Sequence, residues 1–218
     1  MIVRATRDIA ANEEILSPYV IADADNAVTQ KQYETVWGFT CKCHICTLEA
    51  ETPPEQRKER QAAIAEAKTF FENNSPASPT KASIARAERL FEKMEKTYDE
   101  QAFSKSPRLG LVDLGTWLCR AYQTTNAPKK LISAAEGLLR NLGFVVEIDG
   151  QMVKTKRDFC HLDGSVIEAA MRAAHAYRGQ GKTKLGDEFE RLGRELYVTM
   201  HGEARGFKEN YNASAADD

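Results

Sequence analysis

Three cysteines stand close together at residues 41 to 46, and their spacing indicates a metal site. One residue separates Cys41 from Cys43, and two separate Cys43 from Cys46. Zinc is bound tetrahedrally, and thiolates from one tight loop can supply three of its four ligands without strain. Crowded free thiols on a surface invite oxidation, which also favours metal binding over the alternative of incidental or degenerate thiols. We therefore predict that Cys41, Cys43 and Cys46 bind Zn²⁺.

The fourth ligand of this zinc site is not evident from the sequence. His44 follows Cys43 directly and is not expected to turn back onto the same ion. Other side chains could complete the site, although nothing in their spacing relates them to the cluster: Cys119, Cys160 and His161. A cysteine within an apolar helix is more often a small buried residue, and His161, His175 and His201 fall on separate segments that suggest structural roles. We expect weak or substoichiometric zinc.

The composition favours a soluble chain in a reducing compartment, either nucleus or cytoplasm. A formal net charge of −2 disfavours a phosphate-neutralising surface, so direct nucleic-acid binding is not expected. No apolar run approaches the roughly 18 residues of a membrane span, and the N-terminus lacks the apolar stretch of a signal peptide. In such a compartment, five cysteines with one dense cluster indicate metal ligation rather than disulfides.

The predicted secondary structure around the cysteines changes near residue 50, from short strands to helices. In residues 1–50, short strands are predicted at Ile2-Val3 and at 15–20, with a turn at Asn12 between them. Residues 51–211 are predicted to be helical, and the small polar tail, 212–218, to be disordered. The predicted fold class is mainly α, with a short β and zinc-loop segment before a helical domain.

Within the helical part, apolar residues recur at steps of three and four. The segments with this spacing are 55–72, 84–98, 111–121, 127–142, 166–177 and 185–196. Asn126 is predicted to cap the helix that contains Pro128, and Gly143 to end it. Residues 144–154 predict a hairpin around Asp149-Gly150, and the loop 179–181 predicts an antiparallel helix pair. The layout suggests an array of helix hairpins of the tetratricopeptide kind, with an irregular helical bundle as the alternative.

The first fifty residues resemble the end of a SET-domain protein lysine methyltransferase. The residues that carry the resemblance are Arg7-Asp8-Ile9, Asn12-Glu13-Glu14-Ile15, Tyr19, and Trp37-Gly38-Phe39 directly before the Cys-x-Cys-x-x-Cys element. Asn12 stands where the family has glycine, a mild departure because asparagine tolerates the left-handed conformation. The helical remainder is similar in layout to the C-terminal region of fungal SET proteins and of the SET and MYND type.

The resemblance implies roles for five residues. Tyr19 matches the active-site tyrosine, whose phenol would orient a substrate lysine, and Phe39 an aromatic that lies against the adenine of S-adenosylmethionine. Cys41, Cys43 and Cys46 match zinc ligands that shape one wall of the lysine channel. Without the resemblance, Tyr19 reads as an ordinary strand-end tyrosine and Phe39 as a core residue. The partner implied is a histone or another lysine-containing protein.

The cofactor-binding segments of the family do not precede this stretch. The family uses a Gly-x-Gly segment and an Asn-His-x-Cys segment, and the chain begins where both would already have passed. We therefore expect the C-terminal portion of such an enzyme, without S-adenosylmethionine binding and inactive alone. The alternative is a non-catalytic protein-protein interaction module with a structural metal loop.

Overall fold

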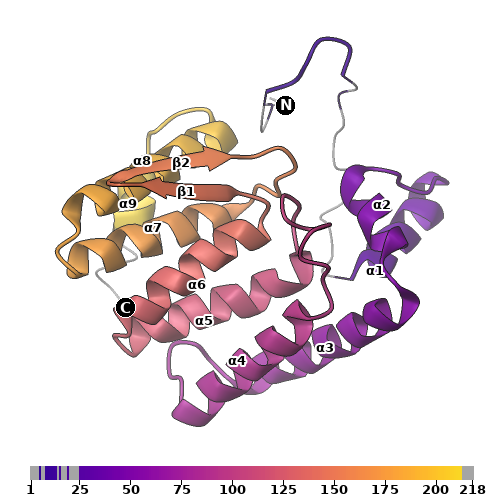
Figure 1. Cartoon of the computed structure of the whole chain (residues 1–218), viewed down its shortest axis with the longest axis horizontal. Helices are drawn as coiled ribbons and strands as arrows, with labels where there is room; N and C mark the ends of the chain where they lie inside the picture. The colour runs from indigo at the N-terminus through magenta and orange to yellow at the C-terminus, as the bar shows by residue number, and fades with distance from the viewer. Residues whose placement is uncertain (1–4, 6–7, 14, 16–18, 20–24, 213–218) are drawn as a thin grey trace.

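The computed structural model describes residues 5, 8–13, 15, 19 and 25–212 of the chain. Most of this part is helical, and its single sheet has two strands (Figure 1). The predicted mainly α class is confirmed at this level. The predicted strand at Ile2-Val3 lies outside the described residues, as do most residues of the one predicted at 15–20; Ile15 and Tyr19 are described and lie in neither helix nor strand.

The N-terminal part contains a turn and two short helices. Asn12 has a φ of +64°, and the Glu13 amide donates to the Ala10 carbonyl over 3.1 Å, so the predicted turn at Asn12 is present. Helix α1, Asn26–Gln32, continues into a π-helical segment, Tyr33–Trp37, which ends at Gly38 with a φ of +71°. The cysteine element leads into α2, His44–Glu51, a helix that the sequence did not predict.

Of the remaining helices, all but the last follow the predicted segments closely, whereas the last one corresponds to none of them. Their bounds are Pro54–Asn73 for α3, Lys81–Glu95 for α4, Val112–Thr124 for α5, Pro128–Asn141 for α6, Gly164–Gly179 for α7, Thr183–His201 for α8 and Phe207–Asn212 for α9. A 3-10 turn, Leu109–Leu111, leads into α5. From α3 to α6 and again from α7 to α8, each helix packs on the next one along the chain, and α6 packs on α7 (Figure 1). Asn212, the first residue of the predicted tail, ends α9, and the rest of that tail lies outside the described residues.

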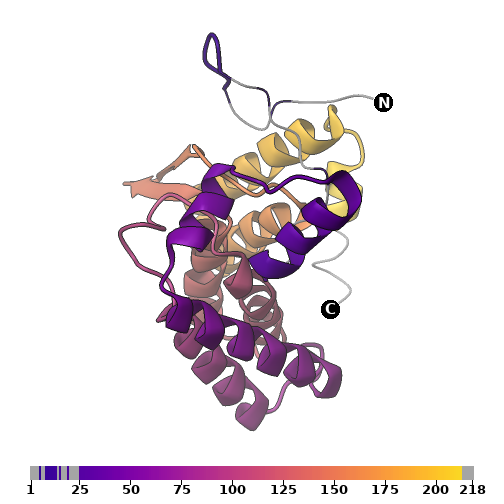
Figure 2. The same ribbon diagram turned by 90° about the vertical axis from the view of Figure 1, so that its right-hand side faces the viewer.

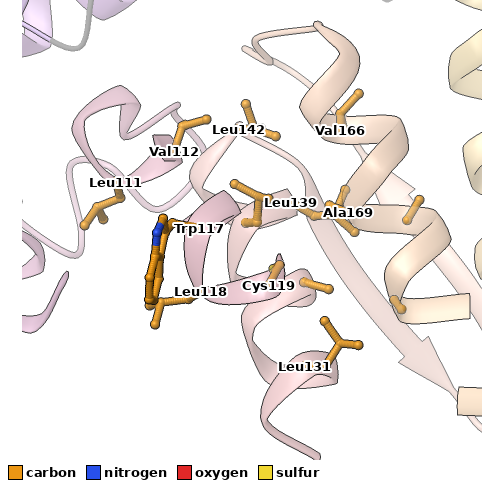
Figure 3. Packing of buried hydrophobic residues seen from close by; sticks show 14 of the residues in the cluster. Leu111, Val112, Trp117, Leu118, Cys119, Leu131, Leu139, Leu142, Val166 and Ala169 are labelled. Atoms are coloured by element: carbon orange, nitrogen blue, oxygen red, sulfur yellow. The ribbon is translucent and has the colours of Figure 1, made fainter. Parts of the chain in front are cut away.

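One hydrophobic core runs through this array. Figure 3 shows its middle, where Cys119 of α5 lies on the side of α6 and α7. The Trp117 ring of the same helix packs towards α3, edge-on to Phe70 with centroids 5.0 Å apart. The Trp117 indole donates a hydrogen bond to the Asn74 carbonyl over 2.9 Å, which satisfies its one polar group inside the core. Cys119 is buried here, as the sequence predicted, and burial raises the pKa of its thiol to about 12.

The hairpin consists of β1, Val145–Asp149, and β2, Met152–Lys156, joined at Gly150, whose φ is +62°. The strands are antiparallel, so the predicted hairpin is present. Asp149 lies opposite Met152, so the two turn residues are Gly150 and Gln151, one position beyond the predicted Asp149-Gly150 pair. β1 packs against α6 and β2 against α8, so the hairpin lies across the array (Figure 1).

Candidate metal centre

The sulfur atoms of Cys41, Cys43 and Cys46 all lie within 4.8 Å of one another. Zinc–sulfur bonds of about 2.3 Å at tetrahedral angles place sulfurs roughly 3.8 Å apart, so a small contraction of the group would fit one ion. Cys46 is buried, and the other two thiols are half-buried. The chemistry and convergence of the donors therefore fit a metal ion such as Zn²⁺, held at three corners of a tetrahedron.

The start of α2 brings these thiols together. Cys43 is the N-cap of the helix, and its carbonyl accepts the Thr47 amide over 2.9 Å. A hydrogen bond from the Cys46 thiol lowers the pKa of Cys43 to about 5, with the backbone amides of Cys46 and Ile45 acting in the same direction and burial opposing them. The same contact raises the pKa of Cys46. Metal binding requires the thiols to lose their protons, so metal affinity should fall as the pH falls.

Helix α1 holds the cysteine loop from the other side. The Gln30 carboxamide donates to the Cys41 carbonyl over 2.9 Å and accepts from the Cys41 amide over 3.0 Å, so one side chain pairs with both backbone groups of a ligand residue. The Asn26 carboxamide donates to the Cys46 sulfur over 3.4 Å. Groups that orient metal ligands in this way contribute to metal affinity without touching the ion.

Replacing Gln30 with alanine should therefore weaken zinc binding. Loss of one such supporting group typically costs about 10- to 100-fold in metal affinity, and we expect the lower end because Cys41 is half-buried. Competition with a chromophoric chelator measures the change. Gln32→Ala, at the exposed end of α1, is the matched control. An unchanged affinity in Gln30→Ala would contradict the orienting role.

Two residues, His44 and Glu49, fasten the cysteine element and α2 to the helical array. Figure 2 shows the short N-terminal helices, in indigo, in front of that array. The His44 Nε2 atom lies 2.7 Å from the Ser106 hydroxyl, and the imidazole stacks on Phe159 with ring centroids 3.8 Å apart. From α2, Glu49 pairs with the buried Arg60 of α3. His44 thus turns away from the sulfurs, as the sequence predicted, and links the loop to distant segments instead.

Aromatic side chains next to the cysteine loop pack against one another. The Tyr19 ring lies edge-on to Phe39 and Trp37, with centroids 5.5 and 5.8 Å apart. Tyr33 stacks on Phe39 at 5.1 Å, and burial, followed by the cysteine thiolates, raises the pKa of its phenol. Tyr19 is 60% exposed and Phe39 37% exposed, so Phe39 is not the core residue of the alternative interpretation. Tyr19 contacts Phe39, Phe39 contacts Tyr33, and the three cysteines lie close enough to Tyr33 for their charge to act on its phenol. Through these contacts the five predicted site residues are linked to one another.

None of the other candidate donors belongs to the group of three; Cys160, half-buried, follows Phe159, whose ring stacks on His44. Cys119 is in the core, and His161 Nε2 is 3.3 Å from an oxygen of Asp163. The His201 ring lies against Tyr197, with centroids 4.2 Å apart. Within the described residues, the three-cysteine group is the only cluster of three or more cysteine, histidine or acidic side chains that meets the distances for a metal ion. Sequence reasoning missed Asn26, Gln30 and Tyr33, because contacts between α1 and the loop leave no local spacing signal.

No helix in the described part of the chain combines the length and apolar character needed to cross a bilayer. Comparison with protein-family models gives no match, and comparison with curated protein sequences gives none either.

Proposed function

We propose that Tyr19 and residues 25–46 form the tyrosine- and zinc-bearing wall of a SET-type lysine-methylation pocket, carried on a tetratricopeptide-like helical scaffold. The observation that carries the proposal is one juxtaposition. The three cysteines with converging sulfurs follow Phe39 closely in the chain. The Tyr19 ring packs edge-on against that same Phe39. The family resemblance requires the tyrosine, the aromatic residue and the thiolates to meet in one place.

In this proposal the metal is structural. Cys41, Cys43 and Cys46 would hold Zn²⁺ and fix the loop, and no chemical step passes through the ion. Tyr19, with its phenol exposed, would accept or donate a hydrogen bond at the amine of a substrate lysine and so orient it. Phe39 and Trp37 would hold the Tyr19 ring in place by edge contacts, and Tyr33 would support Phe39 by stacking on it.

The residues present do not supply a cradle for S-adenosylmethionine. The sequence has no Asn-His-x-Cys segment, and Gly179-Gln180-Gly181 spans the end of α7 and the start of the loop before α8. We therefore derive no methyl-transfer step for this chain alone. Its contribution to such a reaction would be the orientation of lysine and the shape of one channel wall.

Calorimetry with S-adenosylmethionine on the purified 218-residue chain should give no heat of binding. The reason is the missing cradle, because half of a site provides little preorganisation. A parallel titration with Co²⁺, followed by thiolate-to-metal charge-transfer absorption, should show a thiolate-bound ion. Saturable binding of the cofactor, or Co²⁺ spectra without thiolate bands, would each contradict this part of the proposal.

The second candidate is a non-catalytic interaction module with a structural metal loop. The contacts of His44 with Ser106 and Phe159 favour it, because they make the loop part of the array. Metal removal separates the two ideas. If the loop serves the array, a chelator should lower the melting temperature of the whole chain. If the loop is the wall of a pocket, α3 to α8 should melt unchanged.

A further inference from the structure

A groove of about 340 Å³ lies between α4 and α6, with α5 as its floor. We call it the α4–α6 groove. Its middle is lined by Phe91 and Leu118 and by two glycines, Gly115 and Gly137. A Cβ atom added at Gly137 would meet nothing within 4 Å, so this glycine leaves open space over the apolar floor. The volume is in the range of small-molecule sites.

The two ends of the groove differ in charge. At one end Lys130 lies 2.7 Å from Glu88, and the Tyr122 hydroxyl donates to the same carboxylate over 2.7 Å. These groups neutralise one another at that end. At the other end, Arg108 and Arg140 lie with Glu95, whose Oε1 atom is 3.7 Å from Arg108 Nη1, beyond hydrogen-bond distance.

Two buried polar atoms at this second end have no hydrogen-bond partner within the described residues: Arg108 Nε, a donor, and Asn141 Oδ1, an acceptor. Asn141 is 1% exposed, and both residues line the groove. The Arg108 amide donates to the Asn141 carbonyl over 2.8 Å, so the two residues are neighbours. Buried polar atoms are nearly always paired, so an unpaired donor and an unpaired acceptor on neighbouring residues point to a ligand that supplies both counterparts. The pKa of Arg108 is lowered chiefly by burial and further by the like charge of Arg140, while Glu95 acts in the opposite direction. An anion between the two arginines would relieve that repulsion.

We infer that the α4–α6 groove binds a free α-amino acid with an apolar side chain. Its carboxylate would lie on Arg108 and Arg140, and its ammonium group would donate to Asn141 Oδ1 and to Glu95. The side chain would cover Phe91 and the space over Gly137. One ligand of this chemistry satisfies the open donor, the open acceptor, the paired arginines and the apolar floor together. The volume of the groove and the neutralised charges at Glu88 and Lys130 favour a small molecule that is recognised at the other end.

Calorimetric titration of the full chain with leucine, leucinamide and N-acetyl-leucine tests the assignment. Leucine should bind saturably, and leucinamide at least about tenfold more weakly, because it has no carboxylate for the arginines. N-acetyl-leucine, which mimics the last residue of a polypeptide, should also bind more weakly because it has no ammonium charge for Glu95. No binding of leucine, or equal binding of leucinamide, would overturn the proposal. Tighter binding of N-acetyl-leucine would overturn the choice of a free amino acid.

Two variants locate the site. Gly137→Leu should fill the groove and abolish leucine binding, while the chain stays folded because leucine favours a helix more than glycine does. Arg140→Glu, at an exposed position, should weaken binding at least about tenfold. Arg205→Glu makes the same charge change outside the groove and should leave binding unchanged. Leucine binding that survives in both Gly137→Leu and Arg140→Glu would overturn the proposal, whatever the outcome for the cysteine loop.

Discussion

The Cys46→Ser variant should lose its metal. Outer groups that only orient ligands are worth about 10- to 100-fold in affinity, so loss of a direct thiolate should cost more than about 100-fold. Cys46 is the strongest choice among the three because it is the buried thiol, with Asn26 donating to its sulfur and a shared proton linking it to Cys43. Co²⁺ titration measures the loss directly, through the charge-transfer bands that thiolate ligation produces.

Cys160→Ser is the matched control, because that thiol is half-buried and outside the cluster. Its metal affinity should equal that of the unmodified chain. The α3–α8 array should keep its helix content in both variants, since its core contains no residue of the cysteine loop other than partial contact by Leu48. Metal binding by Cys46→Ser as tight as in the control would mean that the sulfurs converge for another reason.

Much of the array could be predicted because each helix buries one apolar face. The stripe of Ile84, Ala87, Phe91 and Met94 becomes one side of α4, and these residues are buried or partly buried against the core. Gly143 ends α6 as predicted: its φ is +88°, and the Phe144 amide donates to the Leu139 carbonyl over 3.0 Å. A Cβ at Gly143 would lie 2.3 Å from the Phe159 carbonyl oxygen, so no other residue fits there.

The prediction for Asn126 is wrong in an instructive way. The N-cap of α6 is Ala127, not Asn126. Because proline disfavours helical geometry in the residue before it, Pro128 places the break at Ala127. Asn126, with a φ of +50°, instead ends α5, and the Ala127 amide donates to the Tyr122 carbonyl over 2.9 Å. The same asparagine type that caps a helix start also tolerates the left-handed helix end, and local sequence could not separate the two.

The three metal-binding cysteines could be predicted from the sequence, but the residues that hold them in place could not. Thiol spacing along the chain is a local signal, so Cys41, Cys43 and Cys46 could be recognised from sequence. The contact of Gln30 with Cys41 and that of His44 with Ser106 join residues far apart in sequence. Helix α2 was missed because eight residues are too few to establish a period, and its amphipathic character is weak. Long-range polar contacts of this kind leave no pattern in one sequence.

Replacing Arg60 with alanine should destabilise the fold more than any surface change. Arg60 is 3% exposed; its guanidinium pairs with Glu49, its Nε donates to the Thr97 hydroxyl over 3.0 Å, and its Cζ lies 3.5 Å from the centre of the Tyr98 ring. Removing one partner of a buried pair costs about 3–5 kcal/mol, because the other charge stays buried without compensation. At about 2–4 °C per kcal/mol, the melting temperature should fall by roughly 10 °C. Urea denaturation followed by circular dichroism measures the loss.

The pH dependence identifies the cause of that loss. Burial raises the pKa of Glu49 despite the opposing effect of Arg60, and without Arg60 it should rise further. A carboxyl whose pKa is raised on folding favours the folded state at low pH, and this contribution is lost as the pH rises through the folded-state pKa. The loss of folding stability in Arg60→Ala should therefore become smaller as the pH falls towards the ordinary pKa of glutamate.

A second substitution, Glu49→Gln, should recover part of this deficit in stability at neutral pH. The control is Arg89→Ala, at an exposed arginine of α4, which should change stability by at most about 0.5 kcal/mol. A deficit that is constant with pH, and that Glu49→Gln does not reduce, would assign the role of Arg60 to packing on Tyr98 instead of to charge.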